Sequence, residues 1–100
     1  MSRTPIPVAR ALQKVGYSFS AARKLQRITS SQLADRAGIS RATLSALEHG
    51  AGGTSIENLL RVARALGIME NLVASLDPYS TDVGKLRVDE ILPQRVRHDQ

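Results

Sequence analysis

The chain contains no cysteine and no tryptophan, and it has only two histidines, His49 and His98. Without cysteine it can form neither a disulfide nor a thiolate metal site, and two histidines are too few for a metal cluster. No apolar run approaches the roughly 20 residues that cross a bilayer, and the start lacks the apolar stretch of a secretion signal. We therefore expect no metal, no cofactor, no membrane partner and a cytoplasmic location.

Arrangements that carry catalysis are also missing. The sequence shows no carboxylate pair, no nucleophile with a nearby base and no glycine-rich phosphate cradle. One hundred residues suffice for one small domain with a modest core, and a two-domain enzyme with a deep cleft needs more. The sequence therefore predicts no enzyme and no catalytic residue.

Positive charge is concentrated in the first quarter of the chain. The formal net charge is +5, but residues 1–27 carry six bases and no acid, residues 28–68 carry +1, and residues 69–100 carry −2. Such an excess suits a surface that faces nucleic-acid phosphates, whose neutralisation supplies most sequence-independent affinity. Alternatively, these basic residues form a helix face that is exposed to solvent and binds no nucleic acid.

Apolar residues in the first quarter repeat at helical spacing. Their spacings of four, three, four, three and three predict one stripe of a helix over about residues 8–26. Gly16 and Ser18 weaken its middle, so the stretch is either one bent helix or a short leading helix followed by a second that begins near Val15. The stripe consists of Val8, Leu12, Val15, Phe19, Ala22 and Leu25.

Two short helices separated by a glycine turn are predicted next. Thr29 is a good N-cap, and Gln32 completes a capping box for a helix over about Ser30 to Ala37. Gly38 suits the left-handed turn that ends this helix, because it has no Cβ to clash. Ser40 then caps a third helix that ends near His49 and Gly50.

The rest of the chain predicts two more helices and a tail. Residues 50–54 form a loop, Ser55 caps a fourth helix with an apolar side that ends at Gly67, and a fifth helix precedes Asp77 and Pro78. The apolar side of the fourth helix is assigned to Ile56, Leu59, Leu60, Val62, Ala63 and Leu66. We therefore expect an all-α fold with an N-terminal extension (1–14), a five-helix domain (15–77) and a C-terminal tail (78–100) with a short ordered piece.

The third helix carries the residues that are best suited to read DNA bases. In a helix-turn-helix, the first residues of the second helix reach base edges in the major groove. Arg41 can donate two hydrogen bonds to guanine, and Thr43 and Ser45 can donate to bases or phosphates. Ala42 can contact a thymine methyl, or is simply small enough to let the helix approach the DNA. The alternatives are an exposed or ion-paired Arg41, with Asp35 or Glu48 as partner, and ordinary polar surface residues.

A second set of residues is suited to phosphates. Ser30 and Ser31 lie at a helix N-terminus, where backbone N–H groups favour an anion, and His49 lies at the end of the third helix. Arg23 is a further candidate for a phosphate contact. Arg23 is also the expected partner of Glu48, whose carboxylate would be repelled by phosphates and would clamp the first and third helices together.

These residues resemble the lambda-repressor-like, Cro/C1-type (XRE) helix-turn-helix family over residues 15–76. The resemblance implies five helices, homodimerisation and binding of double-stranded DNA at a palindromic operator. Two features depart from the family pattern. Ser30 replaces the usual glutamine, and the loop at 51–54 lacks the usual basic residues, so affinity would depend more on Arg3, Arg10 and Lys14. The matching positions are Phe19, Arg23, Lys24, Thr29, Gln32, Leu33, Ala34, Ala37, Gly38, Ile39, Ser40, Leu44, Leu47, Glu48, Gly50, Ser55, Ile56, Leu59, Val62, Ala63, Ala65, Leu66 and Gly67.

The two ends of the chain carry a narrower resemblance. Residues 2–7 (Ser-Arg-Thr-Pro-Ile-Pro) and 92–97 (Leu-Pro-Gln-Arg-Val-Arg) look like small HipB-like antitoxins encoded beside HipA-type kinase toxins. This resemblance implies an autoregulating repressor that also binds a HipA-like kinase. Two alternatives stay open, a free-standing or phage-type repressor without a toxin and a protein-bridging module without an operator of its own.

Overall fold

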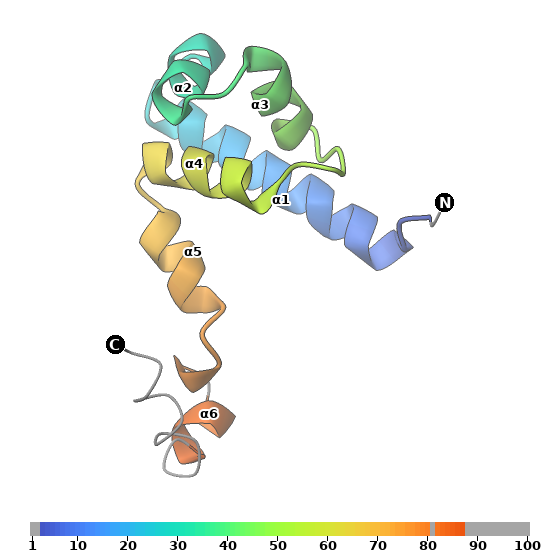
Figure 1. Cartoon of the computed structure of the whole chain (residues 1–100), viewed down its shortest axis with the longest axis vertical. Coiled ribbons are helices and arrows are strands. Elements are labelled where there is room, and N and C mark those ends of the chain that lie inside the picture. Colours follow the sequence, from blue (N-terminus) through green and yellow to red (C-terminus); the bar gives the residue numbers. More distant parts are fainter. Residues whose placement is uncertain (1–2, 81, 88–100) are drawn as a thin grey trace. The chain divides into compact units, whose positions relative to one another are not determined.

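The computed structural model describes residues 3–80 and 82–87, and within them it contains helices and no strand (Figure 1). The helices are α1 (Ile6–Leu25), α2 (Ser30–Ala37), α3 (Arg41–Glu48), α4 (Ile56–Leu66), α5 (Met69–Ser75) and α6 (Asp82–Leu86), with a 3-10 turn at Pro78–Ser80. The predicted all-α fold is confirmed, and the five predicted helices correspond to α1–α5. The chain divides into two compact units, residues 1–69 and 70–100.

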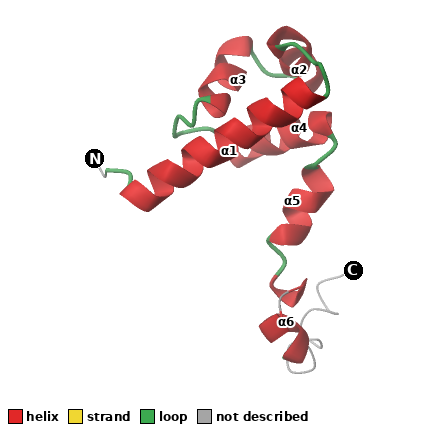
Figure 2. Cartoon of the chain, turned by 180° about the vertical axis from the view of Figure 1, so that it is seen from behind, coloured by secondary structure: helices red, strands yellow, loops and turns green. Residues whose placement is uncertain are grey.

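The first unit encloses the hydrophobic core. α2 packs against α4 and α3, and α1 packs against α3 and α4. Figure 2, seen from behind, shows α1 running across the other three helices. In the part of the chain that the structure describes, ten apolar residues are buried, each at most 6% exposed: Phe19, Ile28, Leu33, Ala34, Ala37, Leu44, Leu47, Val62, Ala63 and Leu66.

The signals at the ends of α2, α3 and α4 act as predicted. The Thr29 hydroxyl accepts a hydrogen bond from the Gln32 N–H at 3.1 Å, and the Gln32 side chain accepts one from the Thr29 N–H at 3.0 Å, which completes the capping box. The Ser40 hydroxyl accepts from the Thr43 N–H at 3.0 Å. Gly38 ends α2 with φ of 71°, a left-handed conformation that costs glycine little.

α1 is one continuous helix across Gly16, so the alternative with a separate leading helix is wrong. The boundary predicted after residue 14 falls inside it. Gly16 is buried where α1 crosses α3, and a Cβ there would lie 2.5 Å from the Leu47 carbonyl oxygen and 2.6 Å from that of Glu48. The absence of a side chain therefore lets the two helix backbones touch.

Four residues of the predicted apolar faces are exposed. Val8 and Val15 are 49% and 44% exposed, and the two largest departures are Leu25 at 84% and Ile56 at 76%. In the predicted stripe, Phe19, Ala22 and Leu25 are spaced three residues apart. A helical turn has 3.6 residues, so each step of three places the next side chain further around the helix from Phe19. Leu25 therefore rotates off the buried face. Ile56 is the first residue of α4, directly after the Ser55 cap, where the helix begins at the surface.

The described part of the second unit is short. It comprises α5 after Met69, the 3-10 turn and α6, and it contains no buried residue. α6 corresponds to the short ordered piece expected in the tail. The apolar positions Val88, Ile91 and Leu92 and the motif at 92–97 lie outside the described residues, as do residues 1 and 2.

Candidate nucleic-acid interface

α3 is divided into an inner and an outer face. Leu44 and Leu47 are 0% and 4% exposed and anchor the helix on the core. The outer face consists of the exposed residues Arg41, Ala42, Ser45, Ala46 and His49. These positions recur at intervals of one, three, one and three residues, so they lie on one side of α3, which faces away from the core.

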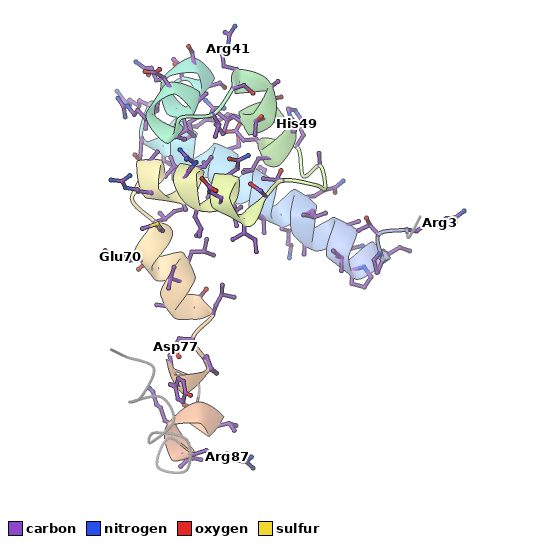
Figure 3. The ribbon with its side chains drawn as sticks, viewed as in Figure 1. Arg3, Arg41, His49, Glu70, Asp77 and Arg87 are labelled. Atoms are coloured by element: carbon purple, nitrogen blue, oxygen red, sulfur yellow. The ribbon has the colours of Figure 1, made fainter. Side chains whose placement is uncertain are left out.

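Arg41 extends from the first turn of α3 into solvent. Figure 3 shows its side chain directed away from the neighbouring helices. Among the described residues, neither Asp35 nor Glu48 forms an ion pair with it. A free guanidinium at this position can donate two hydrogen bonds in the fork that matches the O6 and N7 acceptors of guanine.

The N-terminus of α2 lies on the same surface as Arg41. Ser31, Gln32 and Asp35 of α2 and Arg41 of α3 line one hollow between the two helices. Ser30 and Ser31 are exposed, and their hydroxyls take no part in the capping-box hydrogen bonds between Thr29 and Gln32. The candidate phosphate contact Ser31 and the candidate base contact Arg41 therefore lie on one surface. Asp35 was missed as a member of this surface, and its negative charge opposes phosphates.

Thr43 and Ser45 are placed differently from Arg41. Thr43 is half-buried, and its hydroxyl oxygen accepts a hydrogen bond from the Ser40 hydroxyl at 2.9 Å, which leaves its own O–H free to donate. Ser45 is exposed in the middle of the outer face. Ala46 lies beside it and was missed, although its spacing of four from Ala42 predicts the same face.

His49 is held by the backbone of its own helix. Its Nδ1 lies 2.7 Å from the Ser45 carbonyl oxygen, which can only accept, so Nδ1 carries the hydrogen. The remaining Nε2 can donate to a phosphate only when the ring is protonated. His49 is exposed at the outer end of α3 (Figure 3), within reach of a ligand on this face.

The predicted pair of Arg23 and Glu48 is confirmed. Nε of Arg23 donates to one Glu48 carboxylate oxygen at 2.8 Å, and Nη2 donates to the other at 3.1 Å. Nη1 donates to the Ile28 carbonyl oxygen at 3.1 Å. The side chains of Arg23 and Glu48 are only 12% and 8% exposed. The hydrogen bond with Glu48 raises the pKa of Arg23, while burial opposes this rise.

This geometry corrects the assignment of Arg23 to phosphate. All three guanidinium nitrogens donate inside the protein, and the group lies between α1 and the end of α3. Arg23 therefore fixes α3 against α1 and neutralises the one carboxylate on α3. The remaining phosphate candidates are Ser30, Ser31 and His49.

The order of elements is that of a helix-turn-helix, since a short helix and a glycine turn lead into a second helix with a free outer face. A helix-turn-helix family model matches residues 19–69, slightly more than half of the chain. The chain belongs to this Cro/C1-type (XRE) helix-turn-helix family. It is a DNA-binding transcription regulator, and double-stranded DNA is its ligand. No curated protein and no solved structure matches the chain.

Among residues 3–80 and 82–87, no group of three or more potential metal-ligating side chains comes together. No described helix is long and apolar enough to cross a bilayer.

Proposed function

We propose that this regulator is a homodimeric, sequence-specific transcriptional repressor that inserts α3 into the major groove of a palindromic operator. The observation that carries the proposal is the shared surface of Ser31 and Arg41, with the outer face of α3 exposed beside it. In this arrangement Arg41, Ala42, Thr43 and Ser45 read bases, and Ser30, Ser31 and His49 hold phosphates.

The decisive test is a substitution of Arg41. Duplexes selected from a random library by the wild-type protein are titrated with the wild type and with Arg41→Ala. Arg41→Ala should weaken binding by about 1–3 kcal/mol per half-site and relax the preference at one base position in each half-site. Arg64→Ala, which removes an exposed arginine of α4, is the matched control and should keep the preference.

The outcomes separate the candidate functions. An unchanged base preference in Arg41→Ala would remove Arg41 from the reading residues. Binding that shows no preference over random DNA, or that responds little to salt, would favour the protein-bridging module, because phosphate contacts make affinity fall with salt.

The homodimer is proposed because a palindromic site is matched by a two-fold protein. Val73 and Leu76 in the second unit are 55% and 76% exposed, which suits a surface that a second copy covers. Val73→Asp with Leu76→Asp should shift sedimentation from dimer to monomer. A wild-type chain that sediments as a monomer at every concentration, with and without DNA, would contradict the homodimer.

The role as antitoxin of a HipA-type kinase is a narrower proposal. It rests on residues 2–7 and 92–97, which lie outside the matched family segment and largely outside the described residues. Co-expression with the neighbouring gene tests it directly. Co-purification of a kinase-like protein would support the antitoxin role, and its absence would favour a free-standing repressor.

A further inference from the structure

The helix-turn-helix itself carries little positive charge. From the start of α2 to the loop at 51–54 the chain has two arginines, Arg36 and Arg41, and the loop itself has no lysine or arginine. Arg36 lines a separate hollow with Arg61 and Arg64 of α4, and Arg41 is assigned to a base edge. Most cations for the phosphates must therefore come from another part of the protein.

α1 supplies such cations upstream of the matched family segment. The family model begins at residue 19, whereas α1 begins at Ile6. Arg10, Lys14 and Tyr17 follow one another at spacings of four and three, so they lie on one side of the helix. All three are exposed, Tyr17 by 73%, and they line one surface hollow with Gln13 and Ser18.

We call the side of α1 that carries Arg10, Lys14 and Tyr17 the cationic stripe. It lies next to the C-terminal end of α3. Gly50 follows His49 directly, and a Cβ at Gly50 would lie 2.7 Å from Cα of Gln13 and 2.9 Å from its backbone nitrogen. Gln13 lies between Arg10 and Lys14, within one turn of both. Figures 1 and 2 both show the first turns of α1 extending beyond α3 at the loop that follows it.

The opposite side of the same turns is apolar. Val8, Leu12 and Val15 line a hollow together with Ile56 and Leu59 of α4. The cationic stripe therefore does not face α4. Within the described residues no carboxylate pairs with Arg10 or Lys14, and residues 1–27 contain no acid. Two free cations and a phenol O–H are the donors that phosphate oxygens accept.

We propose that Arg10, Lys14 and Tyr17 form a second phosphate-binding surface, which grips the DNA backbone beside the C-terminal end of α3. The proposal rests on the proposed function, because α3 sets where the duplex lies. The stripe supplies affinity without base preference, while α3 supplies the preference. This division of roles distinguishes the two surfaces in an experiment.

The test is the salt dependence of binding for Arg10→Gln with Lys14→Gln. Wild-type and variant proteins are titrated with the selected duplex and with a random-sequence duplex over a range of salt concentrations. The slope of log K against log salt should become shallower by about 3.6 for the proposed dimer, because four phosphate contacts, two in each protomer, are lost at about 0.9 each. Affinity should fall by the same factor for both duplexes, and Tyr17→Phe should weaken binding without changing the slope.

The control is Arg36→Gln with Arg64→Gln, which removes the same charge from exposed residues that line a hollow between α2 and α4. It should leave the slope near the wild-type value. An unchanged slope in the α1 variant, or an equal change in the control, overturns the phosphate surface and leaves the proposed function intact. If the wild type binds both duplexes equally, base reading by α3 is contradicted, while the salt slopes still test the phosphate-binding surface on α1. If the wild type binds neither duplex, both the proposed function and the phosphate-binding surface are overturned.

Discussion

The pair of Arg23 and Glu48 makes a quantitative prediction, because α3 depends on it for its position against α1. Glu48→Ala removes two charge-assisted hydrogen bonds, of 2.8 and 3.1 Å, and leaves the Arg23 guanidinium with the Ile28 carbonyl oxygen. Removing one partner of a buried ion pair costs about 3–5 kcal/mol. Since the two side chains keep 12% and 8% exposure and water can reach them in part, we expect about 3 kcal/mol, the lower end of that range.

This loss is large enough to measure without ambiguity. For a domain of this size, 1 kcal/mol shifts Tm by about 4–8 °C, so Glu48→Ala should lower Tm by about 12–24 °C. Thermal unfolding gives Tm and urea unfolding gives the free energy, and both can be followed by far-ultraviolet circular dichroism, because the chain is helical and has no tryptophan.

The chain offers a matched control for this substitution. Glu57 pairs with Arg61 at 2.9 Å, but the two side chains of this pair are 73% and 48% exposed. Glu57→Ala should therefore cost less than about 1 kcal/mol. The reasoning fails if Glu48→Ala and Glu57→Ala destabilise the protein equally. It also fails if Arg23→Ala and Glu48→Ala are additive in the double variant, because a direct pair must show coupling.

Three further substitutions test the fold and the interface. Gly16→Ala should destabilise the protein by about 2 kcal/mol in the same urea assay, because the new Cβ would overlap the Leu47 and Glu48 carbonyl oxygens; an increase in stability from the better helix propensity of alanine would refute the close contact. Ser40→Ala should cost about 1 kcal/mol through loss of the cap on Thr43, and a loss within experimental error would contradict it. Asp35→Asn should tighten binding to selected and random duplexes alike, because it removes a negative charge beside Arg41; unchanged binding would place Asp35 outside the interface, and weaker binding would contradict its repulsion of phosphates.

The local signals in the sequence predicted the helix-turn-helix well, because each acts within a few residues. The Thr29 and Gln32 capping box, the left-handed Gly38 and the Ser40 cap depend on neighbouring backbone groups alone. The prediction that Glu48 pairs with an arginine of the first helix also held, since a carboxylate on a DNA-binding helix needs a neutralising partner.

Local signals in the sequence could not predict features that depend on contacts between helices. Gly16 was interpreted as a weak point of a helix, whereas its role is the contact of α1 with the α3 backbone, which requires knowledge of the crossing. Arg23 was assigned both to phosphate and to Glu48, and only its burial decides between them. Leu25 and Ile56 lie at helix ends, where periodicity cannot show which side is covered.

The central claim is that the outer face of α3 contacts DNA, and the absence of cysteine allows a direct measurement. Single-cysteine variants Ala46→Cys, on this face, and Arg64→Cys, on the exposed side of α4, are alkylated with and without the selected duplex. We predict that the duplex slows alkylation of the Ala46→Cys variant in proportion to the bound fraction and leaves the Arg64→Cys variant unchanged. Equal rates for Ala46→Cys with and without bound DNA would contradict the claim.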